Sequence, residues 1–292
     1  MSRVTARRRV VRLDGTAEGL VRRGGEEYTA AEEPLELRIG GQPFTVTMRT
    51  PGDDFDLVAG HLVSEGVLAT PHDVVRMKFC SADNGCSSTA YVDGDASLAF
   101  ADGDPLNIVD VTLAPDIALP EDRLRRSSYV TSACGVCGKT SIDAVHATMR
   151  WPVTEDDAKV SAQTLFTLPD RMRDAQKVFA KTGGLHAAAL FTPEGELLCL
   201  REDVGRHNAV DKVLGWALRT DRLPLRGHVL AVSGRASFEL VQKALAAGIP
   251  MLTAVSAPSS LAVTLAADSG LTLVGFLRGR TANVYCGAER IV

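Results

Sequence analysis

Apolar and polar residues alternate in two runs near the start of the chain, 35–39 and 44–48, and Gly40-Gly41 lies between them. A period of two with a glycine pair between the runs predicts a β-hairpin. The apolar spacing then changes to three and four residues, which predicts a helix that ends near Gly66. The same criteria predict further short strands over 74–80, 89–92 and 108–113. The first third of the chain is therefore expected to be a small α+β part.

The last part of the chain shows strand and helix patterns in regular alternation. After a predicted helix over 169–181, two strands are expected to pair across the turn at Thr192-Pro193-Glu194-Gly195. The later strands are predicted over 229–232, 251–255 and 271–277, and the helices between them over 237–247 and up to about Gly270. Short loops between strand and helix favour right-handed crossovers and a largely parallel sheet covered on both faces.

The carboxyl ends of the three later strands carry glycine, hydroxyl and arginine residues. In open α/β sheets, ligands gather at this edge. Free backbone N–H groups at helix starts and guanidinium groups suit phosphate, whereas turn formation alone also explains each glycine and serine. The candidate residues are Ser233, Gly234, Arg235, Ser256, Ser259, Arg278, Gly279 and Arg280. Three such loops at one edge favour an anionic ligand without naming it.

Composition changes this picture little. The apolar fraction of 45% and the charged fraction of 23% are ordinary for a globular protein, and the net charge of −4 gives no case for nucleic-acid binding. No apolar run is long enough to span a bilayer. Arginines crowd residues 1–32, which are expected to form a basic, flexible and solvated arm. Six cysteines without an export signal fit a reducing cytoplasm.

The strongest candidate for chemistry is the pair Cys134 and Cys137 in a glycine-rich loop over 127–140. A helix is predicted to begin directly after this loop. Its N-terminal N–H groups, its dipole and Lys139 would favour thiolate, so the pKa of these thiols is expected below the free value of about 8.5. The pair can act as a redox couple, as half of a metal site, or as a nucleophile with a resolving neighbour.

Three motif assignments compete for this loop and each one is incomplete. Gly138-Lys139-Thr140 resembles the end of a phosphate-binding loop, but Ala133 occupies the position of the required glycine. A closed zinc site needs four ligands, and Cys80 and Cys86 are far upstream. The deaminase signature has proline where this chain has Ala133. A reactive pair is favoured over a structural one, and Cys80 with Cys86 is expected to be an ordinary pair of strand or loop cysteines.

Several long blocks of sequence resemble the formate dehydrogenase accessory sulfurtransferase family, FdhD, over residues 33–292. The blocks include 48–54, 134–139, 182–187, 201–212, 233–235, 255–260 and 275–280. The resemblance implies a core similar to cytidine deaminase, a homodimer, and no structural metal. Among the histidines, His207 is expected at the start of a helix, and His186 is expected to be satisfied by backbone.

The resemblance also implies a function. Persulfide sulfur would come from a cysteine desulfurase, rest on Cys134 with Cys137 assisting, and pass to the molybdenum (or tungsten) bis-guanine-dinucleotide cofactor of formate dehydrogenase. Guanosine diphosphate would mimic that cofactor. The implied cofactor contacts are Phe276, Leu277, Arg278, Gly279, Arg280 and Thr281. A non-catalytic chaperone for the cofactor and a structural zinc protein are the alternatives.

The expected organisation has four parts. Residues 1–32 form the arm, 33–126 the N-terminal α+β part, 127–140 the reactive loop, and 141–292 the α/β core. The expected fold class is α/β, with a cytidine-deaminase-like three-layer core. The expected partners are the desulfurase, formate dehydrogenase and a second copy of the chain, without nucleic acid or membrane.

Overall fold

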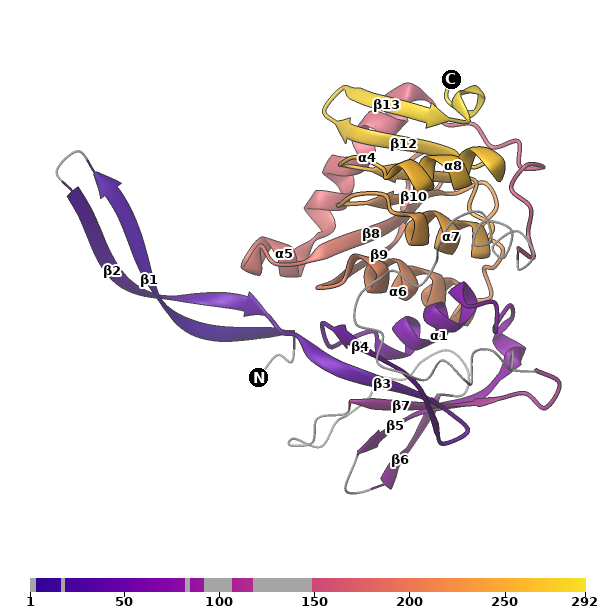
Figure 1. Ribbon diagram of the computed structural model, residues 1–292, viewed down its shortest axis with the longest axis horizontal. Helices are drawn as coiled ribbons and strands as arrows, with labels where there is room; N and C mark the ends of the chain where they lie inside the picture. The colour runs from indigo at the N-terminus through magenta and orange to yellow at the C-terminus, as the bar shows by residue number, and fades with distance from the viewer. Residues whose placement is uncertain (1–3, 17–18, 82–84, 92–106, 118–148) are drawn as a thin grey trace.

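The computed structural model describes residues 4–16, 19–81, 85–91, 107–117 and 149–292, and Figure 1 shows their arrangement. Two sheets are stacked along the molecule, and a long two-stranded arm projects away from both. The predicted reactive loop, with Cys134 and Cys137, lies outside the described residues.

The larger sheet has six strands in the order β13-β12-β11-β10-β8-β9. These strands are β8 (His186–Phe191), β9 (Leu197–Asp203), β10 (Val229–Val232), β11 (Met251–Ala254), β12 (Thr272–Arg278) and β13 (Thr281–Cys286). The pairs β10–β11 and β11–β12 are parallel, whereas β8, β9 and β13 add antiparallel pairs. The expectation of a largely parallel sheet is corrected, because hairpins at both edges make the sheet mixed.

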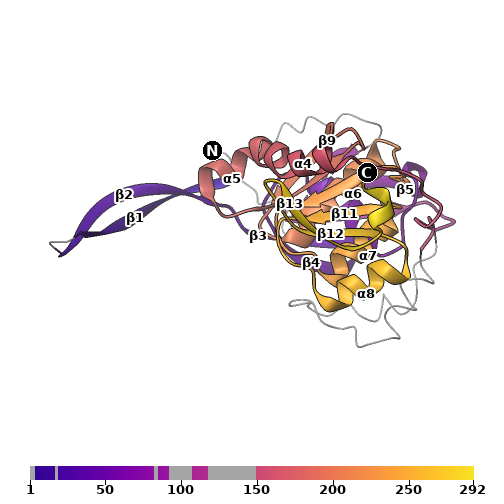
Figure 2. The same ribbon diagram turned by 90° about the horizontal axis from the view of Figure 1, so that it is seen from above.

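Helices cover both faces of this sheet, so the core has three layers (Figure 2). On one face lies α4 (Ala162–Ala175), whose Leu165, Leu168 and Met172 are buried in one apolar cluster. On the other face lie α6 (Arg206–Arg219), α7 (Phe238–Ala246) and α8 (Ser260–Asp268). Because neighbouring residues of a strand point to opposite faces, Ala188 and Leu190 join one cluster and Ala189 and Phe191 join the other. The likeness to cytidine deaminase stays a prediction.

The smaller sheet has five strands in the order β4-β3-β7-β5-β6. They are β3 (Glu33–Ile39), β4 (Gln42–Arg49), β5 (Val74–Ser81), β6 (Gly85–Tyr91) and β7 (Ile108–Leu113), with a 3₁₀ turn at Pro71–Asp73. The predicted hairpin is confirmed as β3 and β4, which pair antiparallel. Its buried row is Leu35, Leu37 and Ile39, whereas Val46 and Met48 remain exposed.

The two sheets meet where α1 (Asp54–Ser64) crosses α6. Two glycines allow the helix backbones to touch. A Cβ on Gly60 would lie 1.7 Å from the carbonyl oxygen of Asp211, and one on Gly215 would lie 1.8 Å from that of Asp56. Larger residues would force the helices apart. One apolar cluster consequently runs from Leu35 in the small sheet to Leu252 in the large one.

The predicted helix over 169–181 starts earlier than expected. The side chain of Ser161 accepts a hydrogen bond from the Thr164 N–H, and α4 runs from there through Pro169. Proline favours the first turn of a helix, which is why the sequence pattern placed the start at this residue. The helix is interrupted at Gln176. The next helix, α5 (Lys177–Thr182), ends at Gly183, which has a φ of 64°.

The arm corrects a second expectation. Residues predicted to be flexible form β1 (Thr5–Thr16) and β2 (Gly19–Ala30), which pair antiparallel with Thr5 opposite Ala30. The arginines interrupt the alternation by which strands are recognised in sequence, although their long side chains are compatible with an exposed ribbon. Most described arm residues are solvent-exposed. The ribbon begins beside α5 and leaves the body there (Figure 1).

The described residues contain neither a membrane-spanning helix nor a metal-binding cluster of side chains. None of the helices in the described ranges is both long enough and apolar enough to cross a membrane. The same residues contain no group of three or more His, Cys, Asp or Glu side chains that could hold a metal ion.

Candidate functional site

The carboxyl ends of β10, β11 and β12 form one continuous edge, here called the carboxyl edge. Backbone hydrogen bonds tie its loops together. Ser256 N–H donates to the Gly234 carbonyl at 3.2 Å, and Phe276 N–H donates to the Ser256 carbonyl at 3.1 Å. Ser259 N–H donates to the Ala236 carbonyl at 2.9 Å. The three predicted loops therefore do converge, and the structure places them on one surface.

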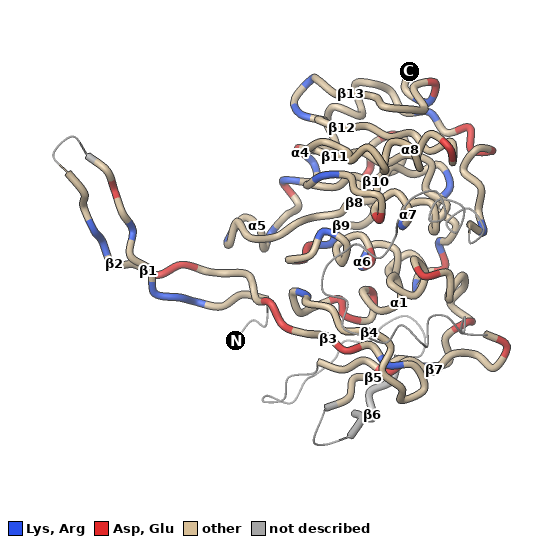
Figure 3. The backbone as a smooth tube through the Cα atoms, in the orientation of Figure 1, with Lys and Arg blue, Asp and Glu red and all other residues tan. Residues whose placement is uncertain are grey.

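The six predicted cofactor contacts lie at the end of β12 and in the turn to β13. Leu277 is buried, whereas Phe276, Arg278, Gly279, Arg280 and Thr281 are exposed. Gly279 has a φ of 53°, which lets the chain reverse between the two strands. Figure 3 shows Lys or Arg positions in blue at the turn between β12 and β13, where Arg278 and Arg280 lie. Leu277 anchors the segment in the core and is unavailable to a ligand.

The two arginines of this turn are held differently. Arg278 Nε donates to the Val255 carbonyl at 2.8 Å, so the side chain lies along the end of β11. Within the described part of the chain, no carboxylate pairs with Arg278, Arg280 or Arg235. Unneutralised guanidinium groups favour an anion with planar, paired oxygens. The carboxyl edge is therefore cationic within a chain that is acidic overall.

An unusual backbone places an aromatic ring at this edge. Phe276 has a φ of 52°, which a residue with a large side chain rarely adopts, and its side chain is 39% exposed. Next to it, a Cβ on Gly275 would lie 2.9 Å from Pro258 Cδ and 3.0 Å from Tyr285 Cε2. Only glycine allows Pro258 and Tyr285 to approach this closely. Tyr285 was missed by sequence reasoning because β13 was not predicted.

A second polar group lies at the starts of α6 and α7. His207 Nε2 lies 3.1 Å from Glu239 Oε2 and 3.2 Å from the Ser237 hydroxyl. The hydrogen bond with His207 is the main reason that the pKa of Glu239 falls to about 2. Glu239 therefore stays ionised across the physiological range and orients the imidazole. Sequence reasoning placed His207 at a helix start but missed Glu239, which is 32 residues later.

His186 at the start of β8 is close to the same group. The pKa of His186 lies below its usual value. Burial is the largest cause, and the positive charges of Arg206 and His207 lower the pKa further. A Cβ on Gly234 would lie 3.4 Å from His186 Nδ1. Arg206 Nε is buried without a hydrogen-bond partner. Burial and these neighbouring charges, rather than the backbone partner expected from the sequence, determine the environment of His186.

The remaining polar residues of the 201–212 block are structural. Asp203 and Lys212 form a buried ion pair at 2.7 Å. Asp203 also accepts from Gly205 N–H at 2.8 Å and from Thr50 N–H at 3.1 Å. Asp211 pairs with Lys243 at 2.6 Å. Burial alone would raise the pKa of Asp211, but Lys243 and His61 hold it below its ordinary value. The Asp203 contacts fix the start of α6 beside the end of β4, and the Asp211–Lys243 pair joins α6 to α7.

Several cysteines lie within the described residues. Cys199 is buried in β9, and burial raises the pKa of its thiol to about 12. Cys286 in β13 also has a raised pKa, again chiefly through burial. Cys80 is disulfide-bonded, and the register of β5 and β6 sets Cys86 opposite it. Neither Cys199 nor Cys286 has the ionised thiol that sulfur chemistry needs.

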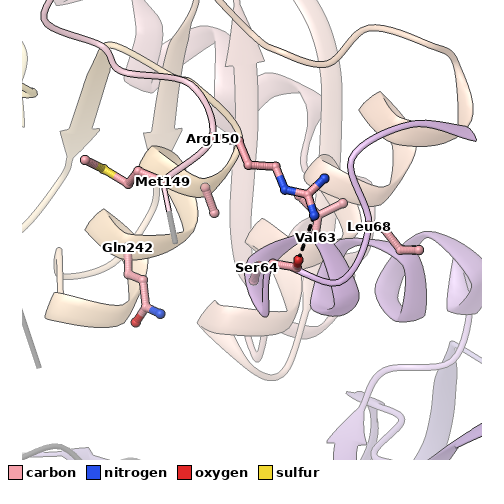
Figure 4. A pocket seen from close by; sticks show the side chains of 8 residues that line it. Val63, Ser64, Leu68, Met149, Arg150 and Gln242 are labelled. Atoms are coloured by element: carbon pink, nitrogen blue, oxygen red, sulfur yellow. Dashed lines mark hydrogen bonds between the residues drawn. The ribbon is translucent and has the colours of Figure 1, made fainter. Parts of the chain in front are cut away.

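A shallow pocket lies away from the carboxyl edge (Figure 4). It is lined by the end of α1, the later part of α7, and the stretch where the described chain resumes at Met149 and Arg150. Arg150 Nη2 donates to the Gly66 carbonyl at 3.1 Å. Because α7 starts at the carboxyl edge, its later residues lie toward the opposite edge. The pocket therefore does not belong to the cationic site.

These features define a mixed α/β protein with a cationic edge suited to an anionic ligand. The sequence model of the FdhD/NarQ family matches residues 30–292. The chain is 55% identical to "Sulfur carrier protein FdhD" of Streptomyces coelicolor, over 100% of this chain and 97% of that protein. It is 54% identical to the protein of that name in Mycobacterium tuberculosis, over 100% of both chains. The chain belongs to the FdhD/NarQ family.

A solved structure agrees with this assignment at the level of fold. It is a formate dehydrogenase accessory protein, as its name describes it, from Desulfotalea psychrophila. The TM-score is 0.72 at 22% sequence identity, and the match covers 99% of this chain and 100% of that one. At this identity the likeness concerns the fold alone.

Proposed function

We propose that this protein is a sulfur carrier for the maturation of formate dehydrogenase. It accepts persulfide sulfur from a cysteine desulfurase and passes it to the molybdenum (or tungsten) bis-guanine-dinucleotide cofactor. The observation that carries the proposal is identity of 53–55% to six proteins named "Sulfur carrier protein FdhD", over 99% or more of this chain. The cytoplasm is the location that this proposal implies.

Loading of sulfur is a thiol exchange that needs no external oxidant. The Cys134 thiolate attacks the terminal sulfur of the desulfurase persulfide. A new S–S bond forms at Cys134 while the donor S–S bond breaks, and the desulfurase cysteine leaves as a thiolate. Two residues separate Cys137 from Cys134, a spacing that lets Cys137 act on the product. Cys134 thus carries one sulfur atom as cargo.

Release of that sulfur can use the second cysteine. The Cys137 thiolate attacks the inner sulfur of the Cys134 persulfide, a disulfide forms between the two residues, and hydrosulfide leaves with the bonding electrons. A thiol reductant then returns both cysteines to the reduced state. Alternatively, Cys134 passes its outer sulfur directly to the acceptor. In that case sulfur release does not need Cys137.

The acceptor of the sulfur is a substrate whose dinucleotide part matches the carboxyl edge. Its pyrophosphate groups carry paired anionic oxygens, which Arg278 and Arg280 can bind in forked geometry. Phe276 and Tyr285 are each 39% exposed and offer ring surface for stacking against guanine. Thr281 is less available, because its hydroxyl already donates to the Arg278 carbonyl at 3.1 Å.

The test is to incubate the full-length protein with a cysteine desulfurase and ³⁵S-labelled cysteine. We expect label that dithiothreitol removes, and its loss in Cys134→Ser. Cys199→Ser is the matched control, because this thiol is buried and remains protonated. Equal labelling of the wild type and Cys134→Ser, or no labelling of an accessible thiol, would contradict the proposal.

A second function is supported by the carboxyl edge itself, which needs no thiol to hold a ligand. In this version the protein is a chaperone that binds the guanine-dinucleotide cofactor and delivers it to formate dehydrogenase. Complementation of a strain that lacks the endogenous protein distinguishes the two functions. Formate dehydrogenase activity restored by Cys134→Ala favours the chaperone, whereas activity restored only by the wild type favours sulfur transfer.

A further inference from the structure

The starts of β8, α6 and α7 lie together at the end of β10, a place here called the β10 end. Because β8 and β10 are antiparallel neighbours, the first residues of β8 lie beside the last residues of β10. Ser233 N–H donates to the Ala187 carbonyl at 3.0 Å, and Ala187 N–H donates to the Ser233 hydroxyl at 2.9 Å. A Cβ on Gly234 would lie 3.4 Å from His186 Nδ1, so glycine lets the imidazole lie against this loop.

The start of α6 carries a positive charge that the described residues leave unpaired. The helix begins at Arg206, its N-cap is Gly205, and no side chain caps it. The first backbone bond into the helix runs from Ala209 N–H to the Gly205 carbonyl at 3.0 Å. Arg206 Nε is buried, and no hydrogen bond with a described residue engages it. A buried donor on a charged group is destabilising without an acceptor, so Arg206 is suited to hold an anion.

The start of α7 is occupied by a carboxylate of the protein itself. Glu239 accepts from its own backbone N–H and from the Ser237 hydroxyl, and its Oε2 lies 3.1 Å from His207 Nε2. These contacts engage Nε2 of the imidazole, and among the described residues Nδ1 has no partner. When the ring is protonated, Nδ1 can donate to an anion. Glu239 is thus a positioning residue that orients His207 and leaves the start of α6 to a ligand.

Positive charges converge on His186. Burial is the largest cause of its low pKa, the charges of Arg206 and His207 lower the pKa further, and Asp203 opposes them. Asp203 is itself neutralised by Lys212 in a buried ion pair at 2.7 Å. The low pKa keeps His186 neutral at pH 7, so its ring donates one hydrogen bond without adding charge. A chain with a net charge of −4 thus holds a cationic group at the β10 end.

We propose that the β10 end is a second anion subsite, at which Arg206, His186 and His207 bind a phosphate group. It is distinct from the turn of Arg278 and Arg280, because β11 lies between β10 and β12. At a strand spacing of about 4.8 Å, the two strand ends are about 10 Å apart. One pyrophosphate group has a single bridging oxygen and is too short to fill both, so the edge binds phosphate at two places. The inference does not rest on sulfur transfer or on either loop cysteine.

The test is isothermal titration calorimetry of the full-length protein with inorganic pyrophosphate at constant ionic strength. All of these titrations carry Arg280→Ala, which weakens the other phosphate site. Adding Arg206→Ala should weaken pyrophosphate binding about ten- to a hundredfold, because hydrogen bonds from a charged donor are lost. Adding Arg226→Ala is the matched control, since it removes an exposed arginine at the opposite edge of the sheet. Unchanged binding after Arg206→Ala, or no binding before it is introduced, would overturn the proposal.

A second titration identifies the molecule that supplies the phosphate. The wild type is first saturated with guanosine diphosphate and is then titrated with pyrophosphate. Binding that persists shows a phosphate ligand separate from the nucleotide. Displacement, together with weaker binding of guanosine diphosphate in Arg206→Ala, assigns the subsite to the phosphates of the nucleotide. Displacement without that weakening contradicts the proposal.

The pKa of His186 provides a measurement that needs no change at the site. A bound phosphate would offset the charges of Arg206 and His207, so this pKa should rise when pyrophosphate is added. Proton NMR of the imidazole over a pH series measures the pKa, and His186→Gln identifies the signal. A pKa that pyrophosphate leaves unchanged would show that no anion binds beside this ring.

Discussion

Arg280 is exposed in the turn between β12 and β13 at the carboxyl edge. Arg278 is fixed by the Val255 carbonyl, whereas within the described ranges no carboxylate neutralises Arg280. A hydrogen bond to a charged group contributes about 1.5–3 kcal/mol. We therefore predict that Arg280→Ala weakens binding of guanosine diphosphate about ten- to a hundredfold.

Thermal unfolding with increasing nucleotide checks this prediction, because a ligand that binds only the folded state raises the midpoint. Arg226→Ala is the matched control. It removes the same charge from an exposed position three residues before β10, at the opposite edge of the sheet. Equal midpoint shifts for Arg280→Ala and the wild type would remove the phosphate assignment from this turn.

The pair of His207 and Glu239 predicts a pH dependence. The folded-state pKa of Glu239 is about 2, below its ordinary value of 4.5. A depressed carboxyl pKa contributes stability above the unfolded value, and this contribution is lost as pH falls from about 4.5 toward 2. Because the carboxylate is 36% exposed, solvent screening makes the effect smaller than the pKa change alone suggests.

We expect Glu239→Gln to be less stable than the wild type at pH 6 and to approach it as pH falls through this window. Urea unfolding at a series of pH values measures the difference. Glu289→Gln is the control, since Glu289 is 76% exposed and 3.9 Å from its arginine neighbour. A difference that stays constant from pH 6 to pH 3 would show that the carboxylate does not act through its charge.

At the scale of elements, the sequence was informative wherever local pattern and burial agree. The strands at 229–232 and 108–113 have the predicted bounds, because each is a short apolar run between clear turn residues. The start of α4 was wrong because Pro169 was read as a first-turn residue. Burial of Leu165 and Leu168 before that proline and of Met172 after it stabilises the helix on both sides. A local rule cannot include this tertiary contribution.

The sequence likewise predicted only part of the candidate site. Converging loops at the carboxyl edge follow from the order of strands and helices, so Arg278 and Arg280 could be placed together. Glu239 and Tyr285 could not, because their neighbours come from elements distant in sequence, and the register of β12 and β13 contains bulges. Cys134 and Cys137 lie outside the described residues, so their position relative to this edge stays a prediction.

At the scale of the whole molecule, the two sheets behave as one folding unit. Lys212 in α6 pairs with Asp203 and donates to the Thr50 carbonyl at 2.9 Å, so it joins the larger sheet to the strand β4 that precedes Thr50. The apolar cluster also extends through both sheets. We therefore predict a single calorimetric unfolding transition for the body, with equal calorimetric and van 't Hoff enthalpies per cooperative unit.

The glycine crossing of α1 and α6 allows this coupling to be tested directly. In Gly60→Ala the new methyl group would meet the Asp211 carbonyl, and overpacking of this kind costs about 1–3 kcal/mol or more. Because the helices belong to different halves, the whole transition should move to lower temperature without splitting. Gly184→Ala is the control, since its methyl would meet neighbours only at 3.8 Å. Two separate transitions in Gly60→Ala, or in the wild type, would mean that the sheets fold independently and that the buried joint carries little of the stability.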